Sequence, residues 1–226
     1  MRLYMTVPSP FVRKCRVVIR EKGLASRVEE VVADPYANTP ELVAANPIVQ
    51  APALVTDDGV ALTDSPLICA WLDEIGTGPK LIPASGDDHW RVRRLEVLAD
   101  SALEMGVKLV LELRRPENER SPSWIARWKD GMGRALDALE AWNPPADPLD
   151  LGVIATGCAV TWIGFRHPSV AATLAKGISN GRNVVIFEQA RGQPLAAVLE
   201  KDKKPLARQL ARARPRSTSC PRWPSQ

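Results

Sequence analysis

Proline and glycine divide the first part of this 226-residue chain into short segments, and this spacing is the feature that most limits its fold. Arg2–Met5 is typical of a short strand. Ser9 before Pro10 predicts the start of a helix, because serine caps helices and proline fits their first turn. Gly23 predicts the end of that helix. The chain therefore begins with a strand followed directly by a helix.

The next segments continue this alternation. Val28–Val32 predicts a second strand, and Pro40–Ala45 predicts a short helix. Ala53–Thr56 and Val60–Thr63 flank Asp58-Gly59, and an Asp-Gly pair between two apolar segments is a strong hairpin signal. Two antiparallel strands are therefore expected here.

A third helix is expected from Pro66 to Ile75, with Ser65 as its N-cap and Gly76 as its stop. The predicted order is strand, helix, strand, helix, strand, strand, helix within residues 1–76. This is the order of the thioredoxin fold, so the first domain is predicted to be α/β.

The rest of the chain is predicted to be all-helical. Amphipathic segments at Trp90–Leu113 and Ser123–Trp142 predict two long helices. A nearly all-apolar helix is expected to follow Asp147 as N-cap and to end at Phe165. The predicted organisation is a thioredoxin-like domain at 1–76, a Gly- and Pro-rich linker at 77–88, a helical domain at 89–200 and a basic tail at 201–226.

The net charge of +4 is concentrated in the tail. Residues 201–226 hold eight basic residues and one acidic residue, so residues 1–200 carry a net charge of −3. Arg, Pro and Ser without apolar periodicity predict a disordered tail, and this is favoured over nucleic-acid binding. The composition of the tail fits both a basic extension and an altered reading frame.

Cysteine and histidine spacing argues against a metal site and against a disulfide framework. The four cysteines form no CxxC pair, and the two histidines are far apart in the sequence. This pattern predicts a reducing, cytoplasmic location. No segment has the form of a signal peptide, and the apolar stretch Leu151–Phe165 suits a buried helix better than a membrane span.

The turn Ser9-Pro10-Phe11-Val12 stands where redox proteins of the thioredoxin fold carry Cys-Pro-x-Cys. Serine and valine replace both cysteines, so disulfide exchange by a CxxC is excluded at this turn. A hydroxyl and the N–H groups of a helix N-terminus can instead stabilise the thiolate of a bound thiol, whose pKa in water is about 8.5. Taken alone, Ser9 is better explained as a helix cap.

Pro52 directly precedes a predicted strand. A cis Ala51–Pro52 bond would turn the N–H and C=O of Ala51 toward the Ser9 turn, where an extended peptide could pair with them. An ordinary trans proline at the start of a strand is the alternative.

Asp64-Ser65 opens a predicted helix. Backbone N–H groups and the serine hydroxyl can hold a carboxylate there, and Asp64 can pair with an ammonium group. A γ-glutamyl group carries both charges on one carbon. Taken alone, the pair is an ordinary helix cap.

Together, in this order and spacing, the three elements resemble the glutathione S-transferase family. The similarity is specific in the first 75 residues and generic as far as residue 200, and it is strongest to bacterial serine-type members that begin Ser-Pro-Phe-Val-Arg-Lys. It is carried by Ser9-Pro10-Phe11-Val12-Arg13-Lys14, Asn46-Pro47, Ala51-Pro52-Ala53-Leu54-Val55 and Asp64-Ser65-Pro66-Leu67-Ile68.

The resemblance implies a transferase that activates the thiolate of glutathione, its co-substrate, for attack on a small electrophile, by conjugation or peroxide reduction. It implies a role in detoxification and a homodimer without metal, membrane or nucleic-acid partners. Ser9 is the implied catalytic residue. The implied glutathione-binding residues are Phe11, Gln50, Ala51, Pro52, Asp64 and Ser65, and the expected electrophile pocket is lined by Met105, Leu109 and Trp162.

The sequence departs from this family pattern in two places. Val49 stands where a small residue is usual, and Gln50 lacks the charge of the lysine often found there. In the C-terminal region, only residues 187–194 resemble the last family helix. The basic tail and the imperfect match of the C-terminal helices keep a second hypothesis open, in which the fold serves as a non-catalytic binding or regulatory module.

Overall fold

The computed structural model describes residues 1–142, 144 and 148–171. The predictions made for residues 172–200 and for the basic tail lie outside the described residues. The described elements are, in chain order, β1 (Arg2–Met5), α1 (Pro10–Glu21), β2 (Glu29–Val32), α2 (Pro40–Ala45), β3 (Ala53–Val55), β4 (Ala61–Thr63), α3 (Ser65–Ile75), α4 (Gly86–Arg114), the 3-10 helix η1 (Glu117–Glu119), α5 (Pro122–Trp142), α6 (Leu151–Arg166) and α7 (Pro168–Ala171).

The four strands form one mixed sheet in the order β2-β1-β3-β4. β1 pairs parallel with β2 and antiparallel with β3, and β3 pairs antiparallel with β4. This is the thioredoxin-like arrangement, and the described elements that follow it are helices, so the predicted fold class is confirmed. Strand β1 and helix α2 have the bounds that the sequence predicts.

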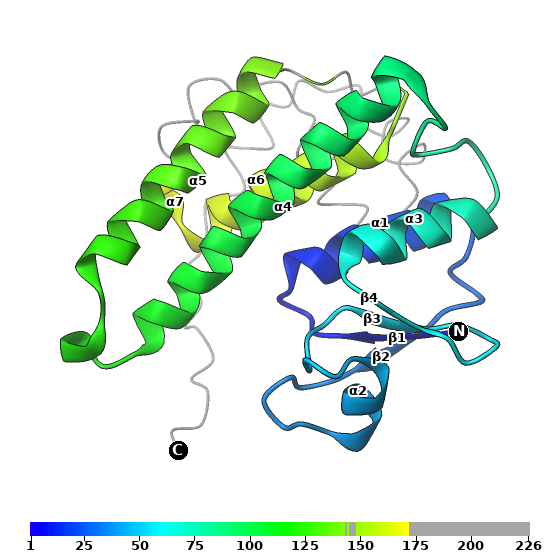
Figure 1. Cartoon of the computed structure of the whole chain (residues 1–226), viewed down its shortest axis with the longest axis horizontal. Coiled ribbons are helices and arrows are strands. Elements are labelled where there is room, and N and C mark those ends of the chain that lie inside the picture. The colour runs from blue at the N-terminus through cyan, green and yellow to red at the C-terminus, as the bar shows by residue number, and fades with distance from the viewer. Residues whose placement is uncertain (143, 145–147, 172–226) are drawn as a thin grey trace, which may run out of the picture.

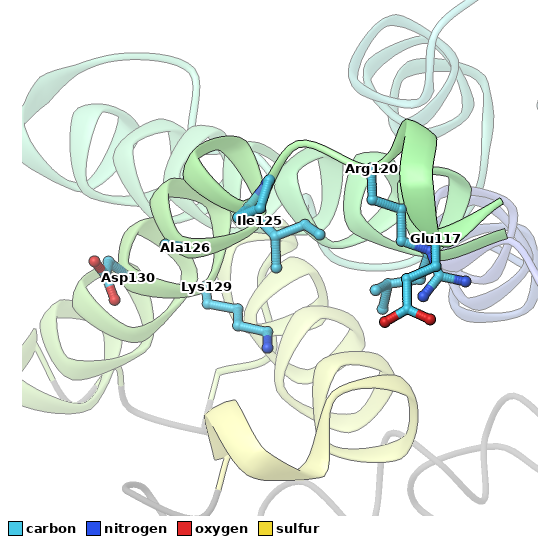
Figure 2. Close-up of a pocket in the computed structure, with 8 residues that line it drawn as sticks. Glu117, Arg120, Ile125, Ala126, Lys129 and Asp130 are labelled. Carbon is cyan, nitrogen blue, oxygen red and sulfur yellow. The ribbon is translucent and has the colours of Figure 1, made fainter. Parts of the chain in front are cut away.

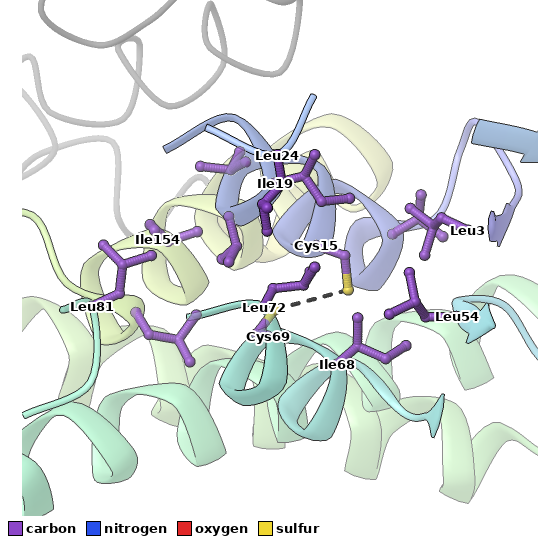
Figure 3. Packing of buried hydrophobic residues seen from close by; sticks show 14 of the residues in the cluster. Leu3, Cys15, Ile19, Leu24, Leu54, Ile68, Cys69, Leu72, Leu81 and Ile154 are labelled. Atoms are coloured by element: carbon purple, nitrogen blue, oxygen red, sulfur yellow. Dashed lines mark hydrogen bonds between the residues drawn. The ribbon is translucent and has the colours of Figure 1, made fainter. Parts of the chain in front are cut away.

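Two layers of helix cover the sheet. Helices α1 and α3 lie side by side on one face, and α2 lies on the other (Figure 1). The core under α1 and α3 joins Leu3 and Leu54 of the sheet to Ile68 and Leu72 of α3 (Figure 3). Ile154 of α6 belongs to the same cluster, so the sheet domain and the helical region share one apolar core.

Cys15 of α1 and Cys69 of α3 meet in this core, with their sulfur atoms 3.8 Å apart (Figure 3). Both side chains are fully buried. Burial raises the pKa of the Cys15 thiol well above its ordinary value, and the contact with Cys69 raises it further. The two cysteines therefore act as small apolar core residues rather than as nucleophiles.

Helix α6 packs against both α4 and α1, and it is buried over most of its length. Gly152 permits the close approach to α4, because a Cβ there would lie 2.9 Å from the Cβ of Leu95 and 3.0 Å from the Val92 carbonyl oxygen. Among the described helices, none combines the length and the apolar character needed to cross a membrane.

Two predicted N-caps are wrong, because an aspartate adjacent to the helix does the capping. Helix α3 begins at Ser65 itself, and Asp64 is its N-cap, with Oδ1 accepting the Ser65 N–H at 2.8 Å. Helix α6 is capped by Asp150 rather than Asp147, with Oδ1 accepting the Val153 N–H at 2.9 Å. In both cases the carboxylate takes a backbone donor that the helix itself leaves unpaired.

The start of α4 also differs from the prediction, because the helix begins at Gly86, inside the expected linker. Asp87 and Asp88 lie in its first turn, where negative charge is favourable beside the helix N-terminus. The glycine that suggested a linker is the first residue of a helix of 29 residues.

Candidate functional site

The strand register brings the three predicted elements to one edge of the sheet. Tyr4, near the end of β1, pairs with Ala53 at the start of β3, and Ala53 pairs with Thr63 at the end of β4. The turn that follows β1, the loop that precedes β3 and the helix start that follows β4 therefore emerge together. These segments carry Ser9, Ala51-Pro52 and Asp64-Ser65.

Ser9 is half-buried and is the N-cap of α1. Its Oγ accepts the Val12 N–H at 3.3 Å. A serine hydroxyl has two acceptor sites and one donor hydrogen, and the cap uses only one acceptor site. Among the described residues no acceptor takes the hydroxyl hydrogen. The capping role and the donation of a hydrogen bond to a sulfur atom are therefore compatible in one side chain.

The Ala51–Pro52 peptide bond is cis. Ala51 is half-buried, two residues before the first paired residue of β3, and Pro52 is buried. The loop before them is held by Asn46, whose Nδ2 donates to the Gln50 carbonyl at 2.9 Å and whose Oδ1 accepts the Ile48 N–H at 3.2 Å. Asn46 is buried and thus fixes the path of the chain toward Ala51.

Two details of this loop bear on the predicted binding residues. The side chain of Gln50 is exposed at the surface. Val49 has a φ of 53°, in the left-handed region that glycine adopts easily and a β-branched residue rarely does. The unusual residue noted at this position in the sequence therefore coincides with an unusual backbone conformation.

Asp64 and Ser65 differ in exposure. Asp64 is exposed, has a φ of 69°, and uses one carboxylate oxygen for the cap, which leaves the other toward solvent. Ser65 is fully buried, and its Oγ has no hydrogen-bond partner among the described residues. A buried hydroxyl without a partner is costly, so a ligand acceptor at this point would gain a hydrogen bond.

A buried ionic cluster lies beside this edge, and the sequence did not predict it. Lys14 on the second turn of α1 is 1% exposed, and its Nζ lies 3.0 Å from Oε1 of Glu96 on α4. The same Nζ binds Oδ2 of Asp100, one turn further along α4. Arg93 binds the second oxygen of Glu96 at 2.6 Å. The cluster ties the helix that Ser9 caps to the helical region.

The members of this cluster differ in how strongly the protein favours their charged form. Burial raises the pKa of Asp100 to about 6, against the opposing effect of Lys14 and with added repulsion from Glu96 and Asp64. Burial also opposes the charge on Lys14, but the attraction of the Asp100 and Glu96 carboxylates and the hydrogen bond to Asp100 raise the pKa of the lysine. Lys14 is therefore the firmly charged member, and the second oxygen of Asp100 has no partner among the described residues.

The structure places the predicted pocket residues in or against the core of the helical region. Leu109 is fully buried and Trp162 is 6% exposed, while Met105 is half-buried against the same cluster. The Trp162 indole N–H donates to the Pro8 carbonyl at 2.9 Å, next to Ser9. Phe11 is half-buried and also packs against this cluster. Of the three, Trp162 is brought to the Ser9 turn, whereas Leu109 faces the interior.

A surface hollow of about 480 Å³ lies elsewhere, between the end of α4, η1 and the start of α5 (Figure 2). It shares no residue with the Ser9 edge, and its side chains carry balanced charge. We assign the candidate site to the Ser9 edge, because the polar groups gather there. The hollow is lined by Leu113, Glu117, Arg120, Pro122, Ile125, Ala126, Lys129 and Asp130.

Comparison with known proteins shows the family to which the chain belongs. Residues 8–75 match the family model for the N-terminal domain of glutathione S-transferase, a range that includes all three elements. An uncharacterized GST-like protein of Escherichia coli (strain K12), YibF, is 32% identical over 171 residues, which cover 74% of this chain and 84% of that protein.

Two solved structures show the same architecture. A glutathione transferase family member from Pseudomonas fluorescens Pf-5, with bound glutathione, is 30% identical with a TM-score of 0.74, over 87% of this chain and 97% of that one. A glutathione S-transferase from Methylobacterium radiotolerans, in complex with glutathione sulfonate, is 27% identical with a TM-score of 0.73, over 87% and 92%. On its fold and on these matches, the chain belongs to the glutathione S-transferase family.

Proposed function

We propose that this chain is a serine-type glutathione transferase, in which Ser9 activates the thiol of glutathione for attack on a small electrophile. The observation that carries the proposal is the meeting of the Ser9 turn, Ala51-Pro52 and Asp64-Ser65 at one edge of the sheet. Related family structures hold glutathione or its derivatives.

The residues at this edge fit the chemistry of the tripeptide. The exposed carboxylate of Asp64 suits the γ-glutamyl ammonium group, and the unpartnered Ser65 hydroxyl suits the γ-glutamyl carboxylate. The backbone of Ala51, just before β3, suits pairing with the cysteinyl unit as an added strand. Gln50 offers an amide near the glycine carboxylate.

In this arrangement the Ser9 hydroxyl lies next to the sulfur of the glutathione cysteinyl unit. Its hydroxyl hydrogen has no acceptor among the described residues, so it can donate to the sulfur while the Oγ keeps capping α1. The N-terminus of α1 adds favourable potential for negative charge. Both effects favour the thiolate over the thiol and lower the thiol pKa from about 8.5.

In the conjugation reaction the thiolate sulfur forms a bond to an electrophilic carbon. A leaving group such as halide departs with its electron pair, or, in an addition, the π electron pair of an activated double bond moves onto the activating group and the adduct takes up a proton. In peroxide reduction the thiolate attacks the terminal peroxide oxygen, the O–O bond breaks, the sulfur becomes a sulfenic acid, and the released alkoxide takes up a proton. A second glutathione then completes a disulfide and releases water.

Binding and turnover can be tested separately. We expect calorimetric titration to detect glutathione binding, and Ser65→Ala to weaken it by roughly tenfold, as expected for one hydrogen bond to a charged group. We also expect turnover of a chromogenic aryl halide, with kcat/KM reduced by Ser9→Ala. Binding by the wild type without turnover across aryl halides, enones and peroxides would favour the binding-module hypothesis, and no binding at all would refute the proposed site.

The homodimer, the cytoplasmic location and a detoxification role are proposed on the family resemblance. Light scattering on the purified full chain tests the first, with twice the chain mass of 24.7 kDa expected.

A further inference from the structure

The turn that carries Ser9 is held by a residue from the far end of the described chain. Trp162 on α6 donates its indole N–H to the carbonyl oxygen of Pro8 at 2.9 Å, across 154 positions of sequence. Val7 and Pro8 are exposed, so the turn has little packing of its own. Trp162 is buried.

This hydrogen bond acts on the peptide unit that enters Ser9. The carbonyl of Pro8 and the N–H of Ser9 belong to one planar group. Trp162 binds the carbonyl, and the N–H of Ser9 donates to the Thr6 carbonyl at 3.2 Å. With both ends of the plane bonded, the direction of the bond from N to Cα of Ser9 is fixed, and the cap bond from the Val12 N–H then restrains the position of its Oγ.

The indole is itself tightly located. A Cβ at Gly106 of α4 would lie 2.7 Å from Cζ3 of Trp162, so the ring rests directly on the α4 backbone. His167 packs edge-on against the indole with ring centroids 5.8 Å apart. The Nε2 of His167 bonds the Gly106 carbonyl at 2.9 Å. Two elements of the helical region therefore set the place from which the N–H donates.

Two further contacts hold the first turns of α1 to the same region. Arg13 reaches Oγ1 of Thr161 on α6 at 3.5 Å, and Lys14 binds Glu96 on α4 at 3.0 Å. These contacts fix the helix, whereas the Trp162 bond fixes the turn that precedes it. The segments before and after Ser9 are thus both held by the helical region, and together they restrain the position of its hydroxyl.

We propose that Trp162 is a positioning residue, whose indole N–H orients the Pro8–Ser9 peptide and so aims the Ser9 hydroxyl at the bound sulfur. The effect on the sulfur rests on the proposed function; the effect on the turn does not. This role differs from the pocket lining that the sequence suggested for Trp162.

The direct test removes the N–H and keeps the ring. Replacement of Trp162 by 3-benzothienylalanine, through a reassigned stop codon, exchanges the N–H for sulfur in a ring of nearly the same shape. Trp162→Phe is the genetic counterpart. We expect faster amide hydrogen exchange at Ser9 in both. We also expect the pKa of bound glutathione, followed by thiolate absorbance, to rise by about 0.5–1 unit as the donor loses its alignment.

Matched controls separate positioning from general loss of stability. The same benzothienyl replacement at Trp128, which stacks on Trp124 in α5, is expected to leave exchange and thiol pKa unchanged. Gly106→Ala should displace the indole and reproduce the Trp162→Phe result, whereas Gly133→Ala on α5, where a Cβ meets nothing within 4 Å, should not.

The double variant of Trp162→Phe with Ser9→Ala decides whether Trp162 acts through Ser9. We expect it to show the same thiol pKa as Ser9→Ala alone, because no hydroxyl remains to be aimed. Additive shifts, or unchanged Ser9 exchange in the Trp162 variants, would overturn the proposal. If Ser9→Ala leaves the thiol pKa unchanged, or no glutathione binds, the proposed function fails, and the exchange measurement alone decides whether Trp162 holds the turn.

Discussion

The two ends of helix α1 each bury a lysine, but they satisfy its charge in different ways. Lys22, at the C-terminal end, is 1% exposed, and its Nζ lies 3.0 Å from Oδ1 of Asp73 and 2.8 Å from the Pro79 carbonyl. Asp73 also accepts the N–H groups of Leu81 and Ile82 at 2.9 and 3.1 Å. At this end each charged group has several partners.

The N-terminal end is less completely paired. Lys14 faces two carboxylates, and one oxygen of Asp100 lacks a partner among the described residues, as does the Ser65 hydroxyl. The fully paired C-terminal end, through Lys22, anchors α1 to its own domain and to the start of the linker. The less completely paired N-terminal end of α1 lies beside the candidate site. Two of the three buried side-chain atoms without a partner among the described residues therefore lie beside the proposed ligand site, and the third, Arg91 Nη1, lies elsewhere on α4.

The largest effect on stability is expected when either buried lysine of α1 is replaced. Lys14→Met leaves Glu96 and Asp100 buried, and we expect a loss of about 3–5 kcal/mol in the free energy of unfolding. Lys22→Met should cost less, because Asp73 keeps two backbone donors. Urea denaturation measures both.

Lys108→Met on α4 is the matched control for these variants. Lys108 pairs with Glu104 at 3.6 Å with both side chains exposed, so we expect a loss below about 1 kcal/mol. Equal losses in the free energy of unfolding for Lys14→Met and Lys22→Met would contradict the difference in charge pairing between the two ends of α1.

A smaller effect should appear in the pH dependence of stability. The folded-state pKa of Asp100 is about 6, above its ordinary value of 3.8, so the folded state binds the extra proton between these values. Its contribution to stability is therefore present at low pH and is lost as pH rises from about 4 to 6, by on the order of 2–3 kcal/mol.

Asp100→Asn should remove this component, so the stability of the wild type relative to the variant should fall over that window and stay level above it. Asp57→Asn is a control of opposite sign. A hydrogen bond from the N-terminal amino group lowers the pKa of the exposed Asp57, and its contribution is lost as pH falls. A flat difference between pH 4 and 6 for Asp100→Asn would show that its carboxyl is not held protonated by burial.

Local features of this fold were predictable because they depend on neighbours in sequence. Proline at the first helical position marked the starts of α1 and α2, Gly23 marked the end of α1, and the Asp-Gly pair marked the hairpin. The order of these elements, with the strand register, brings the candidate site together. The errors at Ser65 and Asp147 are displacements of one and three positions, since polar residues close in sequence compete for one cap.

Long-range polar contacts were not predictable in the same way. Helical periodicity gives no reason to bury Lys14, whose partners lie 82 and 86 positions away. Trp162 has the spacing of a core or pocket residue, and its bond to Pro8 depends on how α6 crosses α1. Predicting such contacts requires the angles between helices, and the spacing of apolar residues in the sequence does not give these angles.

The smallest stability effect is expected where a hydroxyl has no partner. Ser65→Ala should not lower the free energy of unfolding without ligand and should raise it by up to about 1 kcal/mol, because it removes a buried hydroxyl that has no hydrogen-bond partner among the described residues. Thr56→Val is the control: the buried Thr56 hydroxyl accepts the Val60 N–H at 2.9 Å, and its loss should cost about 1 kcal/mol or more. A large loss for Ser65→Ala would mean that its hydroxyl already has a partner.

The most direct test of the account is the pKa of the glutathione thiol bound to the wild type and to Ser9→Ala, measured by thiolate absorbance across pH. A hydrogen bond to a charged group contributes about 1.5–3 kcal/mol, which corresponds to roughly 1–2 pKa units. We expect the wild-type value to lie below about 8.5 and the Ser9→Ala value to return toward it. Identical titration curves for the two proteins would contradict the role proposed for Ser9.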